Sequence, residues 1–179
     1  MHKKMDVKRL VMNSMLISLS IILTRYLSIR ISFFGVEGVR IGFGALPIFL
    51  AGFMYEPIDG FVVGALADVA GFLISPVGGA YMPQFTLTSA LTGWIPAMVY
   101  KYAFKRKITF VSLMISTGIG QFITDIIMVP YFLNSLFGIP YAVLMPARFV
   151  GFPIMLLAYP TMIIAIMKRV PNFEDQKLS

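Results

Sequence analysis

Cysteine is absent from the 179 residues, and the single histidine is His2. Without thiols, the chain can form no disulfide and has no thiolate to offer a metal or a redox reaction. A lone histidine beside the N-terminus gives no basis for a histidine-based metal site or general base. We therefore predict no metal site, no cofactor and no catalytic residue.

Nucleotide-binding motifs are also missing. The sequence holds no Gly-x-x-x-x-Gly-Lys-Ser/Thr loop, so it cannot bind and hydrolyse ATP by that route. The segments 42–44 and 118–120 each carry two glycines of a dinucleotide fingerprint without the third, and we interpret them as helix-packing positions. Asp68 and Asp125 lack the Gly-x-Gly-Asp type of motif of intramembrane aspartyl proteases. An enzyme is the least favoured class.

Charge is scarce. Only 13% of the residues are charged and 58% are hydrophobic, with a mean hydropathy of +0.84, whereas a soluble domain has roughly 25% charged residues. The uncharged stretches 10–24, 69–100 and 149–167 are long. A run of about 20 apolar residues crosses the roughly 30 Å hydrocarbon layer of a membrane. The chain is predicted to be a membrane protein.

Six apolar spans fit the sequence, at about 10–28, 41–55, 59–74, 85–102, 108–132 and 143–167. Turn residues separate them at 56–60, 75–79 and 134–140. We therefore predict an all-α membrane protein in which residues 1–179 form a single domain, one bundle of six transmembrane helices.

The basic residues predict the orientation of this bundle. The net charge is +7, but the excess lies in short segments beside apolar runs, which is typical of topology signals and not of a nucleic-acid-binding face. With the N-terminus inside, eleven of the 15 Lys and Arg residues fall in inner segments. The positive-inside rule therefore predicts both termini in the cytoplasm of a multi-pass cell-membrane protein, with lipid and no nucleic acid among its partners.

Four arginines fall in the outer half of the predicted bundle: Arg25, Arg30, Arg40 and Arg148. Snorkelling toward the membrane surface suffices for Arg30. Arg25 and Arg148 are flanked by apolar residues, and intramembrane charges usually face a cavity, a partner or a ligand. Because the guanidinium fork matches carboxylates, these residues favour an anionic organic ligand.

Two acids lie inside the spans, Asp68 and Asp125, the latter one turn after Gln121. Three roles stay open for them: an internal ion pair with an arginine, ligand contact, or a proton relay. Aromatic and amide side chains gather toward the outer side, where they would form either an interfacial belt or the walls of a slot for a flat ring. The candidate substrate-binding residues are Arg25, Tyr26, Arg40, Asp68, Tyr81, Gln84, Phe85, Trp94, Gln121, Asp125 and Arg148.

Three segments carry a family resemblance: residues 23–29 (Leu-Thr-Arg-Tyr-Leu-Ser-Ile), 40–48 (Arg-Ile-Gly-Phe-Gly-Ala-Leu-Pro-Ile) and 64–68 (Gly-Ala-Leu-Ala-Asp). With the length and the six spans, they resemble the folate-specific substrate-binding S components of energy-coupling-factor (ECF) vitamin transporters. The resemblance implies a pocket for folate, open to the outside and covered by the first and third connections. It also implies three partner subunits, a transmembrane T component and two cytoplasmic ATPases.

Members of this family dock on the T component through an Ala-x-x-x-Ala type of motif on the first helix. The matching positions here are Ser14 and Ser18. Small residues at this spacing allow close helix contact, and packing inside the bundle is the other interpretation. Two alternative functions stay open, an S component for another vitamin or precursor and a solitary proton-coupled secondary transporter.

Overall fold

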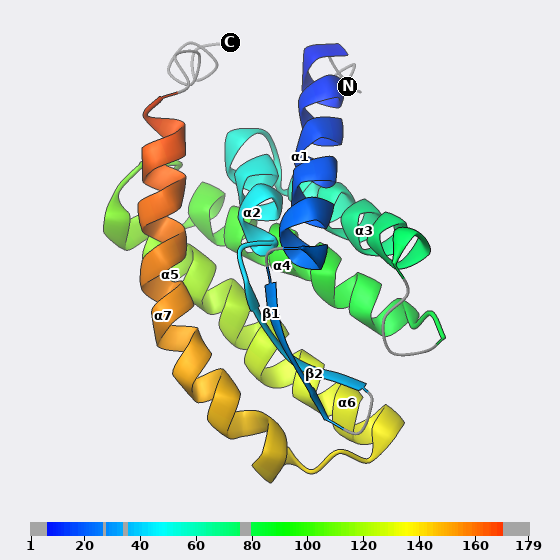
Figure 1. Cartoon of the computed structure of the whole chain (residues 1–179). Coiled ribbons are helices and arrows are strands. Elements are labelled where there is room, and N and C mark those ends of the chain that lie inside the picture. Colours follow the sequence, from blue (N-terminus) through cyan, green and yellow to red (C-terminus); the bar gives the residue numbers. More distant parts are fainter. Residues whose placement is uncertain (1–6, 27, 34–35, 76–79, 170–179) are drawn as a thin grey trace.

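The computed structural model describes residues 7–26, 28–33, 36–75 and 80–169, and only the backbone of residues 29–33, 36–41 and 147. The helices and strands are, in chain order, α1 (Val7–Arg25), β1 (Ser28–Phe33), β2 (Val36–Gly42), α2 (Ala45–Met54), α3 (Pro57–Ile74), α4 (Pro83–Tyr102), α5 (Phe110–Gln121), the π-helix η1 (Phe122–Met128), α6 (Val129–Phe137) and α7 (Tyr141–Met167). Figure 1 shows α5, η1 and α6 as one continuous rod beside α7.

The predicted helical architecture agrees with the structure. Each of the six predicted spans overlaps a helix. The fifth, predicted at 108–132, corresponds to the rod of α5, η1 and α6, which continues to Phe137 and into the turn predicted at 134–140. Four stretches within the described residues are long and apolar enough to cross a membrane: 7–25, 57–74, 110–137 and 141–167. These properties are those of a helical membrane protein.

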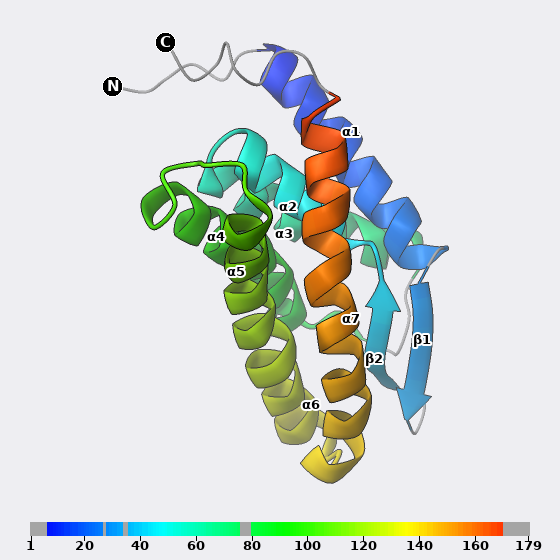
Figure 2. The same cartoon turned by 90° about the vertical axis from the view of Figure 1, so that its left-hand side faces the viewer.

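A β-hairpin in the first connection departs from the all-α prediction. β1 pairs antiparallel with β2, from Ser28 opposite Gly42 to Phe33 opposite Val36, with an irregularity between Ile31 and Ser32. The segment Ser-Ile-Arg-Ile-Ser-Phe alternates polar residues with isoleucine and phenylalanine, a period-two pattern that favours a strand. The segment Val-Glu-Gly-Val-Arg-Ile-Gly follows this pattern except at Glu37 and Gly38, beside the irregularity. The hairpin extends from the end of α1 toward the end of the molecule where α6 meets α7 (Figures 1 and 2).

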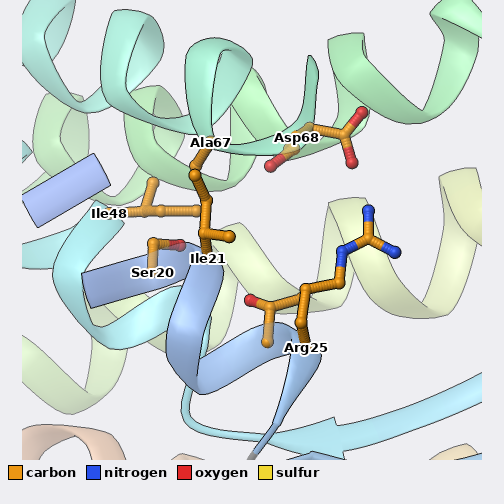
Figure 3. Close-up of a pocket in the computed structure, with 8 residues that line it drawn as sticks. Ser20, Ile21, Arg25, Ile48, Ala67 and Asp68 are labelled. Atoms are coloured by element: carbon orange, nitrogen blue, oxygen red, sulfur yellow. The ribbon is translucent and has the colours of Figure 1, made fainter. Parts of the chain in front are cut away.

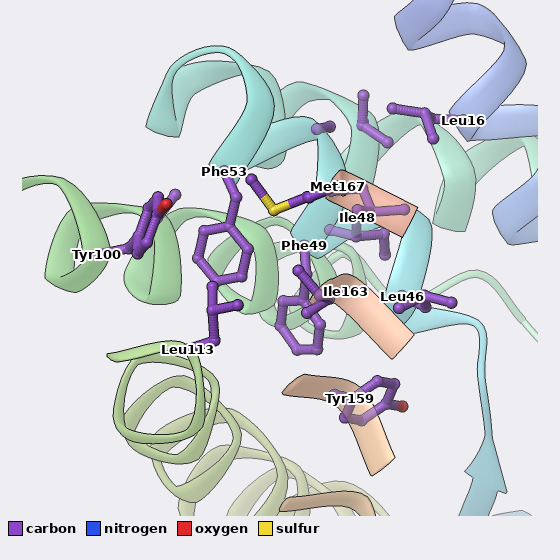
Figure 4. Close-up of a cluster of buried hydrophobic side chains, with 14 residues drawn as sticks. Leu16, Leu46, Ile48, Phe49, Phe53, Tyr100, Leu113, Tyr159, Ile163 and Met167 are labelled. Atoms are coloured by element: carbon purple, nitrogen blue, oxygen red, sulfur yellow. The ribbon is translucent and has the colours of Figure 1, made fainter. Parts of the chain in front are cut away.

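The short helix α2 lies at the centre of the fold. All residues from Leu46 to Phe53 are buried. The Phe49 ring, which is fully buried, meets the Tyr159 ring edge-on at 5.1 Å between centroids. Figure 4 shows this cluster, to which α4, α5 and α7 contribute Tyr100, Leu113, Ile163 and Met167. Ten residues suffice for α2 because neighbouring helices enclose it.

Glycines allow α2, α3 and α4 to approach closely. A Cβ atom added at Gly93 would lie 2.2 Å from the carbonyl oxygen of Gly60, and one added at Gly52 would lie 2.7 Å from the Cβ of Ala97. Such close backbone approach is typical of helix contacts in membranes.

The glycine pairs in 42–44 and 118–120, which we interpreted as packing positions, also leave no room for a Cβ atom, except at Gly42. A Cβ at Gly120 would lie 2.2 Å from Pro96, and one at Gly44 would lie 1.9 Å from the Thr24 hydroxyl. A Cβ at Gly118 would lie 2.8 Å from Leu156. Gly42 is the exception, because it ends β2 and its carbonyl accepts a hydrogen bond from the Tyr159 hydroxyl at 2.8 Å.

One end of the molecule is held together by ion pairs. Asp59, only 3% exposed, accepts hydrogen bonds from both Nε and Nη2 of Arg9 and from Asn13. Its other contact, with the backbone N–H of Glu56, completes a capping box at the start of α3. The first turn of α1 and the last turn of α7 lie at the same end (Figures 1 and 2).

The turn between α2 and α3 is tied to the turn after α4. The Glu56 carboxylate contacts Lys101 Nζ at 2.5 Å and Arg106 Nη2 at 2.8 Å. Partial burial alone would raise the pKa of Glu56, but the hydrogen bond from Lys101 and the positive charges of Arg106 and Lys101 lower this pKa below its ordinary value. The backbones of Lys105 and Arg106 adopt left-handed conformations, with φ of 49° and 58°, and a hydrogen bond from the Tyr100 hydroxyl to the Arg106 carbonyl supports this turn.

Candidate functional site

A pocket lies where the last turns of α1 meet the middle of α3. Its empty volume is about 290 Å³, including space that opens to the outside. Its lining comes from α1, α2, α3 and α4 and consists of Ser20, Ile21, Thr24, Arg25, Ile48, Ala67, Asp68 and Ser89. Figure 3 shows the Arg25 side chain reaching from α1 toward the Asp68 carboxylate, which extends from α3. Two of the predicted site residues, of opposite charge, therefore share one pocket.

Arg25 is seated against the backbone of α3. A Cβ atom added at Gly71 would lie 3.2 Å from Arg25 Nε and 3.3 Å from Nη2. The guanidinium group therefore covers the surface of Gly71, which lies three residues after Asp68 and on the same side of the helix. Sequence analysis did not identify Gly71. Its spacing from an intramembrane acid was the only signal that could have done so.

Asp68 is held by α4. The Thr86 hydroxyl donates a hydrogen bond to Asp68 Oδ2 at 2.6 Å, and the Tyr81 hydroxyl lies 2.7 Å from that of Thr86. The Tyr81 ring packs against Phe72 of α3, with centroids 5.4 Å apart. Tyr81 and Asp68, both members of the predicted site, are thus connected through the Thr86 hydroxyl. Thr86 itself was not predicted from the sequence.

Arg148 and Asp125 form a second polar site. Arg148, 3% exposed, donates from Nη1 to Asp125 Oδ1 at 2.5 Å and to the Asp125 carbonyl at 2.6 Å. Of the three roles considered for Asp125, the structure contains the internal ion pair. Asp125 lies within η1, so the pair fastens α7 to the π-helical part of the neighbouring rod.

The remaining candidate residues are spread over the fold. Gln121 is buried, and the Oε1 atoms of both Gln84 and Gln121 are buried without a hydrogen bond from any residue that the structure describes. Phe85 meets the Phe132 ring edge-on at 6.4 Å. Tyr26 and Trp94 are exposed, and the side chain of Arg40 lies outside the described residues.

Ser14 and Ser18 lie on a face of α1 that the described residues leave uncovered. Both are exposed, and their hydroxyls donate to carbonyl oxygens of their own helix, those of Leu10 and Ser14. Large apolar side chains surround them, namely Leu10, Val11, Met15, Leu19 and Ile22, each at least 43% exposed. The two serines therefore do not pack inside this bundle.

The fold and the pocket together define a class: a helical membrane protein with a small pocket lined by charged residues among its helices. A family model described as "ECF transporter, substrate-specific component" matches residues 8–168. The chain belongs to this family of transporter components, and the resemblance noted in the sequence is confirmed.

Individual proteins are similar to it along nearly the whole chain. "Folate transporter FolT" of Clostridium novyi (strain NT) is 31% identical over 173 residues, which cover 96% of this chain and 94% of the relative. A crystal structure of FolT bound with folic acid matches with a TM-score of 0.73 at 25% identity, covering 90% of this chain and 91% of that one. The S component of a bacterial ECF transporter shares the fold, with a TM-score of 0.66 at 23% identity and coverage of 93% and 96%.

Proposed function

We propose that this protein captures folate at the outer face of the cell membrane and serves as the substrate-binding subunit of an ATP-driven importer, without catalysing a reaction itself. The pocket that places Arg25 opposite Asp68 carries this proposal. Similarity to a folate transporter and to a folate-bound structure supports the choice of ligand.

The chemistry of the pocket suits the pterin ring of folate. The amino group and the adjacent ring N–H donate hydrogen bonds and would face the Asp68 carboxylate. The neighbouring carbonyl oxygen accepts hydrogen bonds and would face the Arg25 guanidinium. The pocket is small and partly open to solvent. It would therefore hold no more than one ring system, while the rest of folate extends outside it.

The membrane topology proposed for this domain has six spans with both termini in the cytoplasm. The first turn of α1 and the last turn of α7 lie at one end of the molecule, which supports this orientation (Figure 2). That end also carries Arg9 and the Lys101–Arg106 cluster, as the positive-inside rule requires. Arg25 follows Arg9 by 16 residues on the same helix, about 24 Å at 1.5 Å per residue, so the pocket would lie in the outer half of the bilayer.

The partners proposed are a transmembrane T component and two cytoplasmic ATPases, in the membrane of a prokaryotic cell. The uncovered face of α1 would dock on the T component. Ser14 and Ser18 are small and exposed there, and small residues permit close helix contact within a membrane.

The test is to titrate the purified protein, without ATP or partners, with folate, thiamin and riboflavin while recording its intrinsic fluorescence. Folate alone is expected to quench the emission, and mass spectrometry of the freshly purified protein is expected to detect a folate. If another vitamin quenches the fluorescence and micromolar folate does not, folate is not the ligand and that vitamin is.

A further inference from the structure

Three threonines on α4 use their hydroxyl groups in two different ways. Thr88 and Thr92 donate to the carbonyl oxygens four residues earlier, those of Gln84 and Thr88, at 2.9 Å. This is the usual local bond of a threonine inside a helix. Thr86 instead donates to Asp68 of the neighbouring helix, at 2.6 Å. Its hydroxyl is therefore directed at the pocket, unlike those of the other two.

The contacts of Thr86 give this hydrogen bond a direction. A threonine hydroxyl has one proton to donate, and Thr86 donates it to Asp68 Oδ2. The Tyr81 hydroxyl, 2.7 Å from that of Thr86, then donates to the Thr86 oxygen. The packing of the Tyr81 ring against Phe72 holds the Tyr81 end of this pair of hydrogen bonds against α3.

We propose that Thr86 is a positioning residue of the substrate site, which orients the Asp68 carboxylate opposite Arg25 before the ligand arrives. A hydrogen bond to one carboxylate oxygen fixes the rotation of the group, so that less freedom is lost on binding. Thr86 thereby raises the affinity of the pocket for a ligand that presents two neighbouring N–H donors to Asp68. The identity of this ligand rests on the proposed function, whereas the coupling between Thr86 and Asp68 does not.

The experiment compares folate dissociation constants of wild-type protein and three variants, Thr86→Val, Thr86→Ser and Thr92→Val. Thr86→Val keeps the shape but removes the hydroxyl, and affinity is expected to fall about tenfold, as hydrogen bonds to charged groups allow. Thr86→Ser retains the hydroxyl and should bind within about threefold of wild type. Thr92→Val makes the same change at a local hydrogen bond on the same helix and should leave affinity unchanged.

A double-mutant cycle with Asp68→Ala shows whether Thr86 acts through Asp68. Once the acceptor is gone, Thr86→Val should weaken folate binding no further. Normal folate affinity of Thr86→Val, equal losses in Thr86→Val and Thr86→Ser, or additive losses in the cycle would each overturn the proposal.

Thermal unfolding of the ligand-free variants separates this proposal from that of folate binding. Thr86→Val should lower the melting temperature more when Asp68 is present than in the Asp68→Ala protein, where only the hydrogen bond with the exposed Tyr81 hydroxyl is lost. If wild-type protein binds no folate, the choice of ligand fails, and the melting temperatures still decide the coupling. Equal shifts in both backgrounds would overturn the positioning role.

Discussion

Replacing Gly71 by alanine should separate binding from stability, because the two are expected to change in opposite directions. The added Cβ atom would lie 3.2 Å from Arg25 Nε and 3.3 Å from Nη2. Ordinary van der Waals contact begins at about 3.5 Å, so the guanidinium must retreat by a few tenths of an ångström. It would then lose its alignment with a ligand held by Asp68.

The magnitudes follow from this geometry. A misaligned charge-assisted hydrogen bond loses part of a contribution of about 1.5–3 kcal/mol, which predicts folate binding weakened by roughly three- to tenfold. Gly71 lies inside α3, where alanine is favoured over glycine by about 0.5–1 kcal/mol. Thermal unfolding of the ligand-free protein should therefore occur at an equal or higher temperature.

Folate titration and a thermal melt of the same preparation measure both quantities. Gly64→Ala on the same helix is the contrasting variant, since its Cβ would lie 2.3 Å from the Ser89 carbonyl oxygen. Overpacking against backbone should lower its stability, by about 1–3 kcal/mol. Unchanged folate affinity in Gly71→Ala, or a loss of stability as in Gly64→Ala, would refute the inference that Gly71 seats Arg25.

Three further predictions concern other parts of the fold. Asp125→Ala should lower the melting temperature more than Arg148→Met does. Asp125→Ala leaves the buried charge of Arg148 unpaired, whereas Arg148→Met leaves the carboxylate of Asp125, whose side chain is 48% exposed. A larger loss in Arg148→Met would contradict this prediction. Because the pKa of Glu56 is lowered in the folded protein, the ionised carboxylate stabilises the folded state. This stabilisation is complete above the ordinary pKa of about 4.3 and is lost as pH falls through the lowered pKa. Melts across this range should show the advantage of wild type over Glu56→Gln shrinking with acid, and a constant difference would disprove it. Ser14→Trp or Ser18→Trp should abolish cellular uptake while leaving folate affinity nearly unchanged, and loss of both would point to damaged packing.

The helices were predictable because the membrane constrains them strongly. Long apolar runs and the Pro- and Gly-containing turns between them identified every helical span, with ends within five residues of those in the structure. The hairpin was missed because residues 29–40, between the first two predicted spans, were given no secondary structure. The period-two alternation in residues 28–33 is short, and its strand character depends on pairing with residues 36–42.

The site was predictable only in part. Arg25 and Asp68 could be identified because a charge inside an apolar span is costly. Their meeting in one pocket depends on how α1 packs against α3, which no local pattern encodes. Thr86 escaped notice because a helical threonine usually bonds to its own backbone, and only the contact between α3 and α4 directs its hydroxyl to Asp68. Arg148 and Asp125 carried the same charge signal, yet the structure pairs them with each other.

In the proposed mode of binding, Arg25 recognises folate through the fork geometry of its guanidinium. The most direct test of this mode is the folate dissociation constant of Arg25→Lys, which keeps the charge but loses the fork. We predict binding weakened by about tenfold or more, equivalent to about 1.4 kcal/mol, with a melting temperature close to that of wild type. Wild-type affinity in Arg25→Lys would show that the guanidinium fork does not recognise folate.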